Sequence, residues 1–433
     1  MTTSLDTYRD HARQLADLGP AGLRTLRRRA AERFAALGFP TVRHEDWKYT
    51  NLAPLAAQSF ALPNGTPAAD AAALAAAARL GVGTELVFVN GLFAADLSSR
   101  PALPTGVIAT NLAAALTEHP ALVGSHLGTS AALEEDGLTA LNTACIRDGA
   151  FLYVPEGVEL DAPVHCLFLA VPGATPSVVH VRNLIVAGAG SRATLIEQYA
   201  GDGATAHWTN AVSELVIAPG AALAHQRVQR ESLRTFHTGV VAAAQAADSQ
   251  LVSHAVSLGA GLARTAIATR LDAPGAACVF DGLYLADGAQ HVDHHTTIDH
   301  RRPRGTSREL YKGILDGRAT GVFNGKVFVR PDAQQSDAQQ MNKNLLLSDD
   351  AQIDTKPQLE ILADDVKCSH GATIGQLDEQ AIFYLRARGI DAPAARQMLI
   401  RAFANELVDR IAVAPLRERL AAEIATRFPG EAA

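Results

Sequence analysis

The chain has 433 residues, of which 48% are hydrophobic and 19% are charged, and its formal net charge is −7. These proportions are typical of an ordinary globular protein and exclude wholesale disorder. The length suggests about three domains. The acidic balance argues against a nucleic-acid-binding protein, because such proteins usually carry a basic surface.

The number of cysteines and the hydropathy of the chain limit the cellular compartments in which the protein is expected. The cysteines, Cys145, Cys166, Cys278 and Cys368, are too few and too scattered for the disulfide framework of a secreted protein. The first ten residues lack the apolar stretch of a signal peptide. No apolar run reaches the roughly 18 residues that span a bilayer. We therefore expect a soluble, cytoplasmic protein without a membrane partner.

Residues 1–150 are expected to form an N-terminal helical and mixed region. Amphipathic spacing and alanine content predict helices over residues 8–18, 21–37 and 68–80. The apolar run at residues 85–89 is followed by Asn90-Gly91, which predicts a strand that ends in a tight turn.

Residues 151–376 are rich in strand-forming residues and punctuated by short turns. Acidic turns recur at spacings of 15 to 17 residues, at Asp316, Asp332, Asp349 and Asp364. A regular period with small residues at the corners is typical of a parallel β-solenoid, whose coils stack so that strands pair with those above and below. An antiparallel sandwich is the alternative, and the scarcity of hairpin dipeptides disfavours it.

Residues 377–433 are expected to be a C-terminal helical domain. Gly389 ends one helix, Asp391 with Pro393 begins a second, and Pro415 begins a third. The predicted fold class is therefore mainly β, with a parallel β-helix between two helical regions.

A nucleotide site is not expected. Residues 321–326 resemble a Walker A loop, but one spacer is missing and Val327 replaces the Ser or Thr that would hold magnesium. We interpret this string as a turn and the start of a strand.

The densest metal-like cluster is HVDHHTTIDH at residues 291–300. Strand alternation would divide its side chains between two faces, with His291, Asp293, His295 and Asp299 on one and His294 and His300 on the other. A zinc or iron site is one interpretation, since imidazole and carboxylate suit either metal. A surface strand with hydrogen bonds between coils is the other.

Cys368 and His370 form a sharper pair. Two residues apart on a strand, they would share one face with α-carbons roughly 6.5–7 Å apart. A thiolate and an imidazole could bind one metal, but a closed site normally needs four ligands. The others would come from elsewhere in this chain or from another chain. The alternative is a buried cysteine near a surface histidine.

Long strings of this sequence resemble the SufB/SufD family of iron–sulfur cluster assembly scaffolds. The strings are residues 307–315, 325–331, 344–348, 356–361 and 366–373, with shorter support from residues 47–50 and 87–91. The Cys-Ser-His string and residues 375–378 are similar to the SufD branch. Met341 stands at or near the place of a cysteine in the SufB branch, so the resemblance implies the supporting half of the scaffold.

The resemblance also implies a right-handed parallel β-helix, a SUF-system role and specific partners. These are a SufB-like sibling subunit and a SufC ABC-type ATPase. The ATPase would dock on the C-terminal helical domain of residues 377–433 and would hydrolyse ATP in place of this non-catalytic chain. An isolated chain could form a homodimer.

Cys368 and His370 would contribute to a metal site shared with SufB, which holds a transient iron–sulfur cluster or iron. A carbohydrate-active β-helix protein and a metal-dependent hydrolase that uses residues 291–300 are the alternatives.

Overall fold

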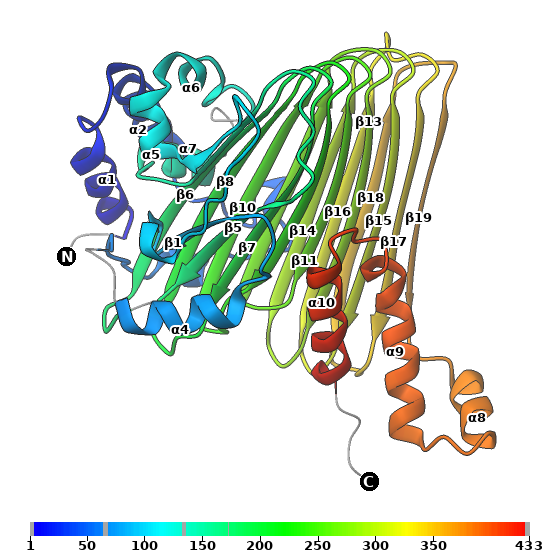
Figure 1. Cartoon of the computed structure of the whole chain (residues 1–433). Coiled ribbons are helices and arrows are strands. Elements are labelled where there is room, and N and C mark those ends of the chain that lie inside the picture. The colour runs from blue at the N-terminus through cyan, green and yellow to red at the C-terminus, as the bar shows by residue number, and fades with distance from the viewer. Residues whose placement is uncertain (1–3, 64–67, 132–135, 172, 429–433) are drawn as a thin grey trace.

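The computed structural model is a two-sided parallel β-solenoid with helices at both ends (Figure 1). It describes residues 4–63, 68–131, 136–171 and 173–428. Each coil contributes one strand to each of two sheets that face each other. The mainly β class and the parallel solenoid predicted from the sequence are confirmed.

Sheet 1 carries most of the odd-numbered strands. In spatial order it contains β19 (Lys367–Gly375), β17 (Asp337–Leu346), β15 (Thr306–Leu315), β13 (Ala277–Ala286), β11 (Gln250–Ser257), β9 (Ala222–Arg230), β7 (Arg192–Gly201), β5 (Val164–Ala170), β1 (Thr84–Val89) and β2 (Leu92–Phe93).

Sheet 2 lies opposite. In spatial order it contains β18 (Gln352–Ile361), β16 (Thr320–Val329), β14 (His291–His300), β12 (Leu262–Leu271), β10 (Thr235–Gln245), β8 (His207–Ile217), β6 (Ser177–Ala187), β4 (Ala150–Val154) and β3 (Ile108–Asn111). Both sheets therefore include strands that precede residue 151.

The register explains the turn spacing in the sequence. Ala277 of β13 pairs with Thr306 of β15, and Thr306 pairs with Asp337 of β17. The chain returns to the same sheet only after crossing the other one. The acidic turns 15 to 17 residues apart therefore mark half coils, one strand each.

Between the sheets lies a continuous apolar core. At its start the rings of Phe88, Phe168 and Tyr199 form a stack, with 4.8 Å between successive centroids. These rings come from β1, β5 and β7, which are adjacent in sheet 1. Offset stacking of large rings adds to the energy of apolar burial, so this stack anchors the first coils.

The N-terminal region covers the start of the solenoid and part of the outer face of sheet 2 (Figure 1). Its helices are α1 (Ser4–Leu15), α2 (Ala21–Leu37), η1 (Glu45–Trp47), α3 (Ala53–Ala56), α4 (Ala68–Ala78), η2 (Ala95–Leu97), α5 (Leu112–Glu118), α6 (Pro120–His126) and α7 (Gly137–Ala144). The helix predicted over 21–37 is confirmed, and those over 8–18 and 68–80 shift at their ends. Helices α5 to α7 were not predicted, because each is eight residues or shorter.

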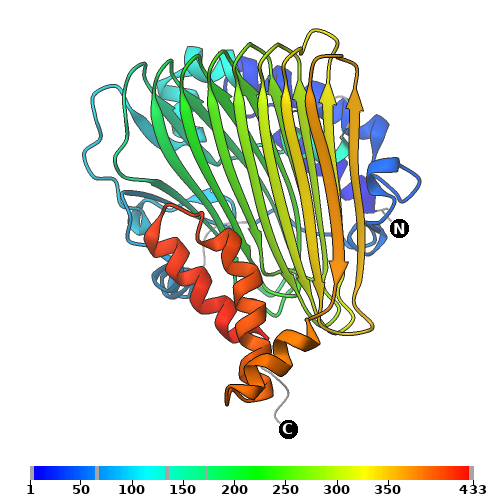
Figure 2. The same cartoon turned by 90° about the vertical axis from the view of Figure 1, so that its right-hand side faces the viewer.

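The C-terminal helices are α8 (Glu379–Ala387), α9 (Ala392–Val408) and α10 (Ala414–Arg427). Figure 2 shows α9 and α10 against the outer face of sheet 1. The buried residues Ile400 and Leu420 join Ile314 of β15 in one apolar cluster. Asp391 caps α9 as predicted, since its carboxylate accepts a hydrogen bond from the Ala394 amide at 2.8 Å.

Within the described residues, no helix is both long and apolar enough to cross a membrane.

Candidate functional site

The last coil of the solenoid is uncovered. Strands β18 and β19 stand at the ends of their sheets, and each pairs with one strand among the described residues. Figure 1 shows β19 at the far end of the stack, with its outer edge open. A strand edge with unpaired N–H and C=O groups is a template for pairing with another chain.

Side chains that face inward in earlier coils are exposed in this one. Ile361 of β18 is 40% exposed, whereas its register partner Val329 is fully buried. Ile374 of β19 is 51% exposed, beside Asn344, which is buried. The last coil thus presents a core-like surface that lacks the next coil to cover it.

Cys368 and His370 lie in this coil, on β19. Their register partners in β17 are Ala338 and Gln340. Cys368 is half-buried against the same core in which Ala338 is fully buried, and burial raises the pKa of its thiol. His370, two residues on, shares that inward side and is exposed. Both side chains therefore point between the two sheets and lie beside the space that a further coil would occupy.

The donor set at this end is incomplete. No group of three or more His, Cys, Asp or Glu side chains within the described parts of the chain could hold a metal ion. A neutral thiol is a poor ligand, but a nearby metal favours the thiolate. Cys368 and His370 could supply two soft or borderline ligands suited to iron, and further ligands would have to come from outside.

The side chains on the outer face of the histidine-rich strand β14 make structural contacts. On its outer face the Thr50 hydroxyl lies 2.9 Å from His291 Nε2 and donates to Asp293 Oδ2 at 2.5 Å. His295 Nε2 is 3.2 Å from Asp293 Oδ1, and Arg264 forms an ion pair with the same carboxylate. This cluster fastens the N-terminal segment to sheet 2.

The charge state of this cluster agrees with a structural role. Burial alone would raise the pKa of Asp293, but Arg264 and His295 outweigh it and hold that pKa well below its usual range. Burial lowers the pKa of His291 and of His295. A permanently ionised, buried carboxylate with a cation partner is a fixed point of attachment.

The inward histidines of β14 pack among core side chains. His294 lies between Tyr284 and Tyr311, with ring centroids 5.3 and 5.4 Å away, and burial lowers its pKa to about 4. His300 Nε2 lies 2.9 Å from the Ser307 hydroxyl. The described residues bring no metal-binding group together here, so the metal-dependent hydrolase is not favoured.

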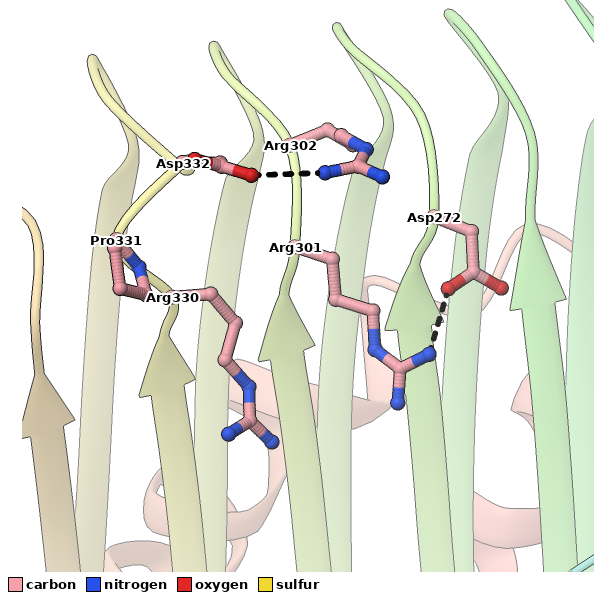
Figure 3. A pocket seen from close by; sticks show the side chains of 6 residues that line it. All are labelled: Asp272, Arg301, Arg302, Arg330, Pro331 and Asp332. Atoms are coloured by element: carbon pink, nitrogen blue, oxygen red, sulfur yellow. Dashed lines mark hydrogen bonds and ion pairs between the residues drawn. The ribbon is translucent and has the colours of Figure 1, made fainter.

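A hollow of about 420 Å³ lies at the corners where β12, β14 and β16 end (Figure 3). It is lined by Asp272, Arg301, Arg302, Arg330, Pro331 and Asp332. Arg301 pairs with Asp272 at 3.1 Å and Arg302 pairs with Asp332 at 3.2 Å, so each pair links neighbouring corners. Arg330 pairs with Asp299 at 2.8 Å. Each of these guanidinium groups therefore has a carboxylate partner.

The Walker-like string at residues 321–326 lies inside β16. The string therefore forms the first part of a strand, as the predicted strand start required, while the predicted turn was wrong and no phosphate-binding loop forms there. Gly325 faces inward, and a Cβ there would collide with the Gln340 amide. The glycine makes room for a side chain across the core rather than for a phosphate.

The C-terminal helices leave a second exposed apolar surface. Phe383 and Tyr384 of α8 are 73% and 57% exposed, and Met398 of α9 is also exposed. The remaining stripe of α9 packs on sheet 1, so most of the apolar surface expected to dock a partner is used within the chain. Only α8 and the adjoining side of α9 present it outward.

Comparison with known proteins identifies the family. Residues 1–166 match the model of the SufBD protein N-terminal region. Residues 170–403 match the model of the SUF system FeS cluster assembly SufBD core domain. Together the two models span the solenoid and most of the helices around it. The chain belongs to the SufB/SufD family of iron–sulfur cluster assembly proteins.

Individual relatives agree with this assignment. An iron–sulfur cluster assembly SufBD family protein of Synechocystis sp. is 38% identical over 91% of this chain and 88% of its own length. The iron–sulfur cluster assembly protein SufD of Escherichia coli is 31% identical over 91% of this chain and 90% of its own. The chloroplastic protein ABCI7 of Arabidopsis thaliana is 32% identical over 78% of this chain and 72% of its own length.

Sequence reasoning missed two inward-facing residues beneath the open end, Glu309 and Gln340. Glu309 of β15 pairs in register with Gln340 of β17, which pairs with His370. In the sequence, each of them differs from its surroundings only in being polar at a position where strand alternation predicts an apolar residue. That signal becomes visible once the register is known.

Proposed function

We propose that this chain is a non-catalytic scaffold subunit of SUF iron–sulfur cluster assembly, which pairs with a SufB-like subunit through the open end of its solenoid. The observation that carries the proposal is the core-like surface of β18 and β19, with Ile361 and Ile374 exposed. A partner with the same architecture would continue both sheets by strand addition. It would also bury the apolar side chains that this chain leaves in water.

The shared site would lie at that junction. Cys368 and His370 would contribute a sulfur and an imidazole, and the partner would supply the remaining ligands of a transient iron–sulfur cluster or iron. The half-burial of Cys368 supports this, because a partner that covers it would exclude water from a reactive thiolate. The cluster is cargo that the complex builds and passes on.

The ATPase partner, a SufC ABC-type protein, would dock on the exposed surface of α8 and the adjoining side of α9. Aromatic residues such as Phe383 and Tyr384 are typical anchors of protein interfaces. ATP hydrolysis is assigned to that partner, since the Walker-like string of this chain is part of a strand. We place the protein in the cytoplasm. When the SufB-like partner is absent, a second copy of this chain would cover the open end of the solenoid and form a homodimer.

Two sets of substitutions test these surfaces separately. Ile361→Lys with Ile374→Lys places charges in the open end and should abolish co-purification of the SufB-like subunit while ATPase capture persists. Phe383→Ser with Tyr384→Ser should do the reverse. Leu233→Lys, at another exposed apolar residue, is the matched control and should change neither. Unchanged pairing in the double isoleucine variant would contradict the open-end interface.

The shared site is tested in cells that depend on this pathway. His370→Ala, Cys368→Ala and the double variant should lower cluster formation while the complex of three subunits still forms. If all three variants mature clusters normally, the two residues are structural and the shared site is wrong.

A further inference from the structure

A column of inward-facing residues leads from the core of the solenoid to His370. In register, Phe280 of β13 pairs with Glu309 of β15, Glu309 with Gln340 of β17, and Gln340 with His370 of β19. Neighbours in such a column lie about 4.8 Å apart, the distance between paired strands. Two polar, buried residues therefore stand directly beneath the exposed histidine.

The first two polar members of this column are joined by a hydrogen bond. Gln340 Nε2 donates to Glu309 Oε2 at 2.7 Å, and both side chains are buried. A carboxylate can only accept hydrogen bonds, so it orients the amide with its nitrogen toward Glu309. The amide oxygen of Gln340 then points away from Glu309.

That amide oxygen has no hydrogen-bond partner among the described residues, although it is buried. A buried acceptor without a donor is unfavourable, so native structures rarely leave one unused. Opposite Gln340 stands Gly325, where any Cβ would collide with the Gln340 amide. The fold therefore reserves space for this amide and leaves its oxygen free.

His370 follows Gln340 in the column and carries a ring N–H that could donate to that oxygen. It lies on the next strand, in register and on the same side. A neutral imidazole has one N–H and one lone pair, and the hydrogen bond that the N–H makes decides which nitrogen is left to bind a metal.

We propose that Gln340, held by Glu309, is a positioning residue for His370: its amide oxygen accepts the ring N–H and turns the other nitrogen toward the junction with the partner subunit. Partners of this kind orient most metal-binding histidines and raise their basicity. Glu309 acts one step further back, through the orientation of the amide. This inference deepens the proposed function and rests on it for the identity of the metal, but the tautomer of His370 can be measured without any metal.

The test is the ¹⁵N spectrum of the His370 ring in the full chain labelled at histidine, assigned with His370→Ala. The sample is kept at pH 8.5, above the pKa of about 7 to which burial raises Glu309. The wild-type chain should show one dominant tautomer with a slowly exchanging ring N–H. Gln340→Leu, of similar size but without the amide, should give averaged tautomers and fast exchange.

Glu309→Gln supplies a second variant that retains the shape of the core. A glutamine at this position can donate as well as accept, so the Gln340 amide is free to turn and the tautomer preference should weaken. Gln245→Leu removes a buried glutamine of β10 that is hydrogen-bonded to Thr269, and is the matched control. It should leave the His370 signals unchanged.

The outcomes separate this inference from the proposed function. If the His370 signals are the same in wild type, Gln340→Leu and Glu309→Gln, the positioning role is overturned whatever the complex does. If they change, the inference holds, and cluster formation by the complex carrying Gln340→Leu should fall about 10- to 100-fold. Normal cluster formation with His370→Ala would overturn the shared site while leaving the tautomer result intact.

Discussion

The two ends of the solenoid are built from the same kind of coil but have opposite surroundings. At the start, antiparallel strands end the parallel pairing, since β2 pairs with β1 and β3 pairs with β4 in that sense. Every residue of β6 is buried. At the other end, most of β19 is exposed, and within the described part of the chain no antiparallel strand follows it in sheet 1.

The difference shows that burial in a solenoid comes from the neighbouring coil. An inward-facing residue belongs to the core only when another layer covers it. The N-terminal region adds a cover outside the sheets as well. On the outer face of sheet 2, Trp208 of β8 packs against Tyr8 and Phe60, with ring centroids 5.5 and 6.2 Å away. The same kind of side chain at the open end has no such cover among the described residues.

The largest expected effect is the loss of a buried ion pair near the start. Arg182 of β6 lies 2.6 Å from Glu214 of β8, and both side chains are almost completely buried. Arg182→Met would leave the carboxylate without its cation and should lower the free energy of unfolding by about 3–5 kcal/mol. Chemical denaturation measures it. Arg182→Met combined with Glu214→Gln should recover part of the loss, and a single variant as stable as wild type would contradict the assignment.

Two isoleucines compare the ends directly. Ile185 of β6 is buried in the core and Ile374 of β19 is half exposed. Ile185→Ala should destabilise the isolated chain by about 2–5 kcal/mol, whereas Ile374→Ala should change it by less than about 1 kcal/mol. Denaturant midpoints of the two variants give the comparison. Equal losses would mean that the open end is already covered in solution, for example by a second copy.

The pH dependence of stability should depend on Glu309. Burial raises its pKa from 4.5 to about 7, so between these values the folded chain keeps a proton that the unfolded chain releases. Raising the pH then favours unfolding, and stability should fall by up to about 1.4 kcal/mol per pH unit in this interval. Glu309→Gln should flatten this part of the stability–pH curve. An unchanged curve would show that the carboxyl titrates normally.

The smallest effect concerns the surface ion pair between Lys356 of β18 and Glu45 of η1. Both side chains are exposed to solvent, and such pairs contribute little because water and salt screen them. Lys356→Ala should leave the thermal midpoint unchanged. A clear loss would mean that the N-terminal segment stabilises the open end as well as the start.

Much of the fold could be predicted from local pattern. The turn spacing predicts the solenoid, the amphipathic stripe predicts α2, and Asp391 predicts the start of α9, because each depends on residues close in sequence. The half-coil period and the short helices α5 to α7 could not be predicted, since a strand or a short helix is stabilised by the surfaces around it. The attachment of Thr50 to Asp293 joins residues 243 positions apart.

The amino-acid sequence alone determined the class of fold, the family and the pair Cys368 and His370, because these follow from periodic patterns and from continuous strings of residues. Only the tertiary structure decided that β19 is the last strand, that its inward side is uncovered and that Gln340 and Glu309 stand beneath His370. The physical reason is the register: pairing between strands about 30 residues apart decides which side chains become neighbours, and the identity of each residue does not encode that alignment.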